Sequence, residues 1–191
     1  MASFDKAVTK TLEWEGGLTT DTGGLTKYGI SQKAYPDLDI AALTIDQAKK
    51  IYKRDYWDPI NLSGLTYQPL ANQIFDIAVN AGPSRAKSLL KDTLIQLNLP
   101  MRYADLSVKS IQELNGRDVM RINNQLVKIR SQFYNDLAAK NSKYKKYLTG
   151  WTNRAIAFFT SDTGTMIAEA GFAIGFFFIA TLIYLNRKGN L

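Results

Sequence analysis

The sequence of 191 residues contains no cysteine and no histidine. Without cysteine, the chain forms no disulfide and offers no thiolate to a metal ion. Without histidine, it has neither a Ser-His-Asp nor a Cys-His catalytic arrangement, and it lacks the ligands that zinc amidases and metallopeptidases use. We therefore expect no metal site and no cofactor. Of the common catalytic arrangements, the one that remains is built on carboxylates.

Acidic residues are scarce in the second half of the chain. Residues 1–83 carry 8 Lys/Arg and 10 Asp/Glu, whereas residues 84–154 carry 14 Lys/Arg and 5 Asp/Glu. A basic half beside a near-neutral half predicts an anionic polymer or surface as a partner, such as nucleic acid, cell wall or anionic lipid; a solvated basic face is the alternative. No nucleic-acid-binding motif accompanies the charge, so we expect no nucleic acid partner.

A carboxylate stands where a predicted helix meets a glycine-rich stretch. Apolar residues at four-residue spacing over residues 4–12 predict an amphipathic helix, and Gly16-Gly17 is predicted to end it. Glu15 is then expected in the last helical turn, where the helix dipole disfavours an ionised carboxylate. Together with the neighbouring Trp14, this raises the carboxyl pKa, as a general acid working near neutral pH requires. The alternative is that Glu15 simply ends a helix.

The stretch after Glu15 predicts a β-hairpin, since residues 16–29 contain five glycines with β-tolerant residues between them. Folded back onto the helix end, this hairpin would bring Asp21 and Thr26 close to Glu15. Glycosidases need such an arrangement, with one carboxylic acid and a second carboxylate or polar group across the scissile bond. The alternative role for Asp21 is to hydrogen-bond its own turn.

Two further helices carry candidate binding residues. The helix predicted over residues 69–81 is apolar around most of its circumference, and Asp76 and Asn80 interrupt it at a spacing of four. Their role is either a structural hydrogen-bonded pair, or substrate contact or support of Glu15. Trp57 ends a helix predicted from Thr44, and its ring either stacks on a sugar or packs in the core.

The later part of the chain predicts three more helices, over residues 84–97, 105–115 and 118–140. A lysine-rich stretch follows, interleaved with two tyrosines; it comprises Lys140, Lys143, Tyr144, Lys145, Lys146 and Tyr147. We interpret it as a solvated face that contacts an anionic wall or lipid.

Five motifs, in order along the chain, resemble the muramidases of glycoside hydrolase family 108, the small helical lysozymes of phages and bacterial secretion loci. The motifs are Glu15-Gly-Gly, Asp21-x-Gly-Gly-x-Thr26-x-x-Gly-Ile-Ser, Tyr56-Trp57-Asp58, Phe75-Asp76-x-x-Val79-Asn80-x-Gly82 and Gly150-Trp151-x-Asn153-Arg154. The resemblance covers roughly residues 4–155. It implies a mainly α, lysozyme-like domain with a small β-hairpin at the active-site cleft, and peptidoglycan as the partner.

The resemblance also implies the reaction and the site. The expected activity is cleavage of the β-1,4 bond between N-acetylmuramic acid and N-acetylglucosamine, for phage entry or host lysis. The alternatives are a lytic transglycosylase, or a non-catalytic virion or envelope protein that retains a lysozyme fold. The family's catalytic glutamate corresponds to Glu15. The predicted site comprises catalytic Glu15, Asp21 and Thr26, and substrate-binding Tyr28, Trp57, Asp76 and Asn80.

The domain organisation expected from the sequence has three parts. Residues 1–97 form the muramidase region, residues 98–160 form a helical second half that resembles a peptidoglycan-binding subdomain, and residues 161–191 form a hinge and a membrane anchor. No N-terminal signal peptide is expected, because the first residues read as an amphipathic helix.

The anchor prediction rests on an apolar run at the C-terminal end. Residues 170–185 contain no charged residue, and residues 165–186 are long enough to cross a bilayer core as one helix. Arg187 and Lys188 follow the run, as at a membrane interface. Gly171 and Gly175 form a possible helix-packing motif. The expected localisation is a viral membrane or the bacterial inner membrane, and the alternative is a buried core helix.

Overall fold

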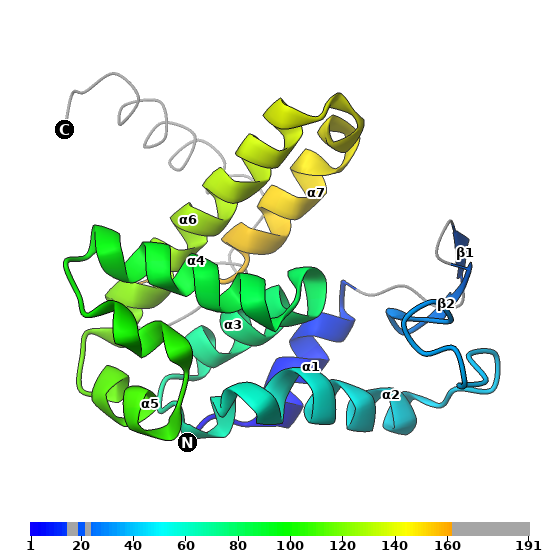
Figure 1. The fold of residues 1–191 in the computed structure, drawn as a ribbon, viewed down its shortest axis with the longest axis horizontal. Helices are drawn as coiled ribbons and strands as arrows, with labels where there is room; N and C mark the ends of the chain where they lie inside the picture. Colours follow the sequence, from blue (N-terminus) through cyan, green and yellow to red (C-terminus); the bar gives the residue numbers. More distant parts are fainter. Residues whose placement is uncertain (15–18, 22–23, 162–191) are drawn as a thin grey trace.

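The computed structural model describes residues 1–14, 19–21 and 24–161, and this part of the chain is mainly helical. Its α-helices are α1 (Phe4–Leu12), α2 (Ile45–Tyr52), α3 (Gln68–Ala81), α4 (Pro83–Gln96), α5 (Val108–Asn115), α6 (Val119–Lys140) and α7 (Lys145–Ile156). Its strands are β1 (Thr19–Asp21), β2 (Gly24–Lys27) and β3 (Ile30–Ser31). Figure 1 shows the small sheet at one side of the helical body. The predicted mainly α fold with a small β-hairpin is confirmed.

The first helix begins as the sequence predicts but ends earlier. Ser3 caps α1 through its side chain, which accepts a hydrogen bond from the backbone of the first turn. The helix ends at Leu12, with Glu13 as its C-terminal cap, and the backbone N–H of Trp14 bonds back to the carbonyl of Thr11 at 3.0 Å. The prediction that the helix continues to Glu15 is therefore wrong, and the dipole argument for a raised pKa loses force, since this effect fades beyond the last turn.

Strands β1 and β2 form the predicted hairpin. They are antiparallel, with Thr19 opposite Thr26 and Asp21 opposite Gly24. Asp21 therefore occupies the register position beside the turn, and the Thr19–Thr26 pair lies two positions further from the turn. The register of the β1–β2 pairs follows from the short connection between the two strands.

A second tight turn joins β2 to β3, a strand that the sequence analysis did not predict. Tyr28 and Gly29 form it, with φ values of 53° and 73°, as a two-residue type I′ hairpin turn requires. A tyrosine at positive φ is uncommon. The hydroxyl of Tyr52 donates to the carbonyl of Tyr28 at 2.6 Å and holds this turn against α2.

Helix α2 begins with the predicted capping box, in which Thr44 and Gln47 bond to each other's backbone. Beyond Tyr52 the helix widens into the π-helical turn η1 (Lys53–Trp57), followed by the 3₁₀ turn η2 (Asp58–Ile60). The predicted helix to Trp57 is thus helical throughout, but its last turn is wider than an α-helix.

Helix α3 is the centre of the fold, as its apolar sequence predicts. Pro69 lies in its first turn, and every residue from Leu70 to Ala78 is buried. The helix packs against α1, α4 and α6. The buried core around it extends from Ala2 to Leu126 and draws on both of the predicted helical parts of the chain.

After α3 the next helix begins one residue earlier than its predicted start at residue 84. Helix α4 begins at Pro83, and Gly82 precedes it with a φ of 88°, which favours glycine. Proline suits the first helical position because it lacks the N–H that would have no helical partner there.

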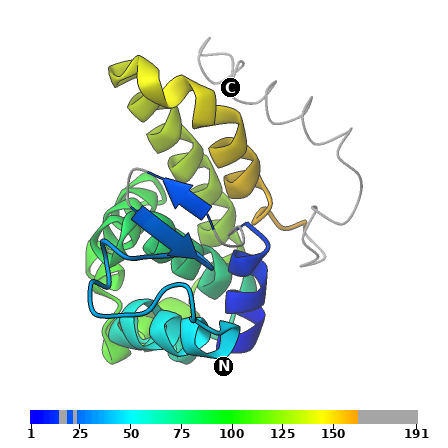
Figure 2. The same cartoon turned by 90° about the vertical axis from the view of Figure 1, so that its right-hand side faces the viewer.

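Helices α6 and α7 form a pair that extends beyond the rest of the helical body (Figures 1 and 2). The short 3₁₀ turn η5 (Ser142–Tyr144) joins them. In Figure 1 the tip of this pair lies above α1, and the β-sheet lies to the right of α1.

The predicted membrane segment, residues 165–186, lies outside the described residues, together with Gly171 and Gly175. Among the residues that the structure describes, no helix has the length and apolar character needed to cross a membrane. The anchor stays a prediction from sequence.

Candidate functional site

A buried carboxylate fixes the end of α1, immediately before the predicted catalytic stretch. Thr11 lies in the last turn of α1 and is fully buried. Its hydroxyl donates to Asp76 Oδ1 of α3 at 3.2 Å. The position from which the chain enters the stretch around Glu15 is therefore tied to the central helix.

Two arginines complete the surroundings of Asp76. Arg130 of α6 donates from Nη2 to Asp76 Oδ2 at 2.6 Å, and Arg154 of α7 donates from Nη2 to Asp76 Oδ1 at 2.9 Å and from Nε to both oxygens at 3.0–3.1 Å. Both ion pairs are buried. Burial alone raises the pKa of Asp76, but the two guanidinium groups outweigh it and hold the pKa below its usual value. Asp76 is thus an ionised structural residue that joins α1, α3, α6 and α7.

Asp76 does not act as the sequence analysis proposed for substrate binding. Its side chain is fully buried and its oxygens are occupied by Thr11 and the two arginines. The position of Asp76 therefore fits the structural role, which was one of the two alternatives. The substrate-binding prediction for Asp76 is corrected accordingly, because a sugar has no access to a carboxylate with no exposed surface.

Asn80 belongs to the same polar network but is not the partner of Asp76. The hydroxyl of Tyr134 donates to Asn80 Oδ1 at 3.2 Å, and Arg130 Nε donates to that hydroxyl at 3.0 Å. The predicted Asp76–Asn80 pair is replaced by a chain of contacts through α6. Asn80 is exposed, so it remains a candidate for contact with substrate.

Trp57 is a core residue. Its side chain has no exposed surface, its ring packs edge-on against Phe4 and Phe75 with centroids 5.6 Å away, and its Nε1 donates to Ser63 Oγ at 2.7 Å. Because no ring face is free, the prediction that it stacks on a sugar is corrected in favour of the core alternative. The π-helical turn η1 directs it inward.

The remaining predicted residues lie on the sheet. Thr26 is the middle-strand partner of both Thr19 and Ser31 and is partly buried. Tyr28 forms the β2–β3 turn described above and is also partly buried. Asp21 has the register position beside the β1–β2 turn. These three residues thus come from one small sheet, which follows the end of α1.

Glu15 itself lies outside the described residues, and its position is not part of the structure. The residue before it, Trp14, is described, and its side chain is 39% exposed. The apolar setting that the sequence analysis expected from Trp14 is therefore only partly present.

The sequence analysis did not identify Thr11 and Arg130 as parts of the site. Thr11 stands on the apolar face of an amphipathic helix, where a threonine gives no signal of its own. Arg130 is one of four basic residues in the amphipathic helix α6. It is fully buried, and nothing in a sequence distinguishes such an arginine from an exposed one. Arg154, by contrast, was part of the Gly150-Trp151-x-Asn153-Arg154 motif.

A separate groove of about 530 Å³ lies between α2 and the loop of residues 34–38. Next to it, the hydroxyl of Tyr35 donates to Asp55 Oδ2 at 2.7 Å, and Arg54 pairs with the same carboxylate. Burial and the hydrogen bond to Asp55 raise the pKa of Tyr35. As far as the described residues extend, the predicted site residues do not line this groove.

Among the described residues, no group of three acidic side chains is placed to hold a metal ion. The described part of the site offers a rigid polar network under the end of α1 and a small sheet that follows it.

Comparisons with known proteins give a family match and a similar solved structure. Residues 8–82 match the family described as glycosyl hydrolase 108, and all seven predicted site residues lie within this range. The solved structure of Brucella abortus SagA aligns with a TM-score of 0.59 and 23% identity, over 84% of this chain and 97% of that chain. This likeness shows a shared fold. No curated protein matches the sequence.

Proposed function

We propose that the protein is a muramidase. Its residues 8–82 match the glycosyl hydrolase 108 family, which makes it a glycoside hydrolase. Its substrate is peptidoglycan, and the bond cleaved is the β-1,4 linkage between N-acetylmuramic acid and N-acetylglucosamine. The observation that carries the proposal is the match of the family to the stretch that contains Glu15, Asp21 and Thr26.

Glu15 is the general acid of this proposal. It lies three residues beyond the end of α1, whose last turn is held to α3 by the Thr11–Asp76 hydrogen bond. A catalytic acid must be held in position against the glycosidic oxygen that it protonates, because small displacements lower the rate strongly. The buried network around Asp76 supplies a fixed base for the chain that carries Glu15.

Asp21 is the second carboxylate, and its role depends on its distance from Glu15. A separation of about 5 Å corresponds to a nucleophile and retention of configuration, whereas about 6.5–9.5 Å leaves room for a water and corresponds to inversion. Thr26, on the neighbouring strand, positions water or sugar in either mechanism. Tyr28 and Asn80 complete the proposed substrate contacts.

Mass spectrometry of the products of peptidoglycan digestion tests the reaction. A muramidase leaves a reducing N-acetylmuramic acid end. An anhydro end instead would assign the protein as a lytic transglycosylase. Absence of cleavage by the folded protein would leave only the non-catalytic alternative.

A membrane anchor over residues 165–186 is a further part of the proposal, supported by the sequence alone. It would place the enzyme on a viral membrane or on the bacterial inner membrane. A protein cut after Asp162 is expected to leave the membrane fraction and to retain cleavage of peptidoglycan. If the full-length protein is also absent from the membrane fraction, the anchor proposal fails.

A further inference from the structure

The tip of the α6–α7 pair is strongly basic. Residues 137–161 contain no acidic residue, and four lysines gather around η5, all of them exposed: Lys140, Lys143, Lys145 and Lys146. The nearest acid in the chain is Asp136, whose Oδ1 accepts a hydrogen bond from Gln132 at 2.7 Å. Within the described part of the chain, no ion pair involves these lysines. Their charges are thus available to an anionic partner.

An aromatic cluster supports this basic tip. Trp151 of α7 packs against Tyr134, Tyr144 and Tyr147, with ring centroids 5.3–5.8 Å apart. Tyr147 stacks on Trp151 at an interplanar angle of 27°. Aromatic contacts of this kind hold the turn between the two helices in one shape, so the lysines project from a fixed platform.

Two of the lysines lie over the tyrosine rings. Lys143 Nζ is 4.9 Å from the centroid of Tyr144, and Lys146 Nζ is 4.8 Å from the centroid of Tyr147. One face of Tyr147 is stacked and the ammonium group of Lys146 lies close to its ring. The tip therefore presents ammonium groups more than free aromatic faces, which favours a carboxylate or phosphate over the apolar face of a sugar.

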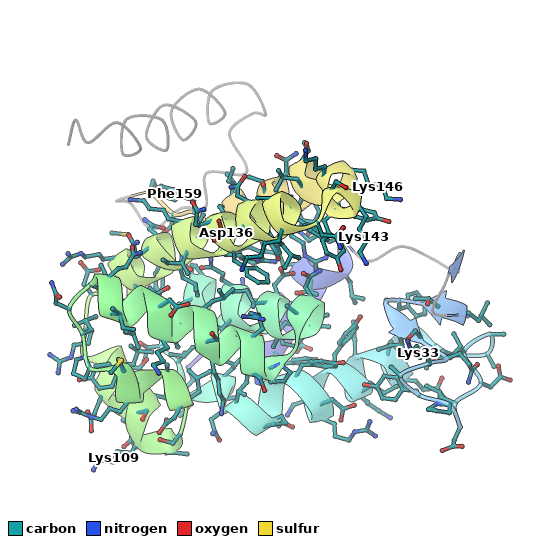
Figure 3. The ribbon with its side chains drawn as sticks, turned by 45° about the horizontal axis from the view of Figure 1, so that its top comes forward. Lys33, Lys109, Asp136, Lys143, Lys146 and Phe159 are labelled. Atoms are coloured by element: carbon teal, nitrogen blue, oxygen red, sulfur yellow. The ribbon has the colours of Figure 1, made fainter. Side chains whose placement is uncertain are left out.

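The tip is connected to the proposed active site through direct contacts. Tyr134, which packs on Trp151, donates its hydroxyl to Asn80 and accepts from Arg130, the partner of Asp76. In Figure 1 the tip lies above α1. Figure 3 shows Lys143 and Lys146 at this end of the molecule and Lys109 at the opposite end.

We propose that the lysine-rich tip of α6–α7 binds the carboxylates of the peptides attached to the glycan, so that the enzyme prefers peptide-bearing peptidoglycan with free carboxylates. The inference rests on the proposed function, which supplies the substrate class. A glycan bound near the end of α1 carries its peptides along its length, and the tip is connected to that region through the contacts of Tyr134 with Trp151 and Asn80. Charge complementarity then favours the peptide carboxylates.

The test compares binding to two forms of the same sacculi, one untreated and one with its carboxylates converted to amides. Co-sedimentation of the full chain measures binding without requiring cleavage. Wild-type protein is expected to bind the untreated form roughly three- to tenfold more tightly, the size expected for a few exposed charge pairs. The double variant Lys143→Gln/Lys146→Gln is expected to lose this difference, and Lys109→Gln is expected to keep it. Added salt is expected to reduce the wild-type difference.

Each result decides a separate point. An unchanged preference in the double variant, with an unchanged melting temperature, overturns the proposal. The proposal is also overturned if the double variant loses binding to vesicles of anionic lipid but binds both forms of sacculi as the wild type does. The tip would then be a lipid site. If wild-type protein shows the lysine-dependent preference but releases no product, the muramidase proposal fails while this inference stands.

Discussion

Asp76 joins helices from both ends of the described chain through contacts to Thr11, Arg130 and Arg154. Two guanidinium groups face a single carboxylate, so the cluster is held together only while Asp76 is ionised. Arg130 Nη1, also buried, has no hydrogen-bond partner among the described residues. The stability of this cluster therefore depends on the charge of Asp76.

Asp76→Asn is expected to destabilise the protein by about 3–5 kcal/mol at pH 7, as removing one partner of a buried ion pair does. Because the folded-state pKa of Asp76 is lowered, its contribution is fully present above the unfolded value of about 3.9. It is lost as the pH falls through the folded-state value. Urea unfolding at pH 7 and pH 3 measures both effects.

The matched control is Asp136→Asn, on the exposed face of α6, which is expected to change stability by less than about 0.5 kcal/mol. If Asp76→Asn leaves the pH dependence of stability as it is in the wild type, the ionised role of Asp76 is contradicted.

At the scale of elements, the small sheet carries three of the proposed site residues, Asp21, Thr26 and Tyr28. The β1–β2 register places Asp21 beside one turn, and the contact from Tyr52 to Tyr28 holds the other turn against α2. Both roles of Asp21, catalysis and support of its turn, are compatible with this register position.

Asp21→Asn separates the two roles, because asparagine removes the charge but keeps an acceptor oxygen for the turn. We expect the rate of peptidoglycan cleavage to fall by at least about 10²-fold, with little change in melting temperature. Asp39→Asn is the control, since Asp39 Oδ1 accepts from the backbone of Ala42 in a turn of its own. Full activity with a changed melting temperature would make Asp21 a turn residue.

The elements themselves were largely predictable from sequence. Ser3, the capping box at Thr44 and Pro69 mark the helix starts through local hydrogen bonding and backbone restriction, and the structure has all three. The end of α1 was predicted less well, because the helix ends at Leu12, before the glycines that were predicted to end it.

At the scale of the whole molecule, burial distinguishes between residue roles that the sequence left open. Trp57 and Asp76 were candidates for substrate contact, and long-range packing encloses both of them completely. Their enclosing partners, Phe4, Phe75 and Arg130 among them, lie far apart in the chain. A pattern of neighbouring residues does not specify such contacts.

The molecule as a whole thus has a helical body whose central helix fixes the end of α1, a sheet beyond it, and a basic tip connected to the same network. We propose that these parts together hold and cleave a peptide-bearing glycan, with Glu15 as the general acid.

The most direct measurement is the rate of peptidoglycan cleavage by Glu15→Gln, beside Glu13→Gln as the control. Glutamine keeps the size of the side chain but cannot donate the proton, so the rate is expected to fall by at least about 10³-fold. Glu13 is exposed at the end of α1, and its variant is expected to remain fully active. Near-normal cleavage by a folded Glu15→Gln protein would contradict the account.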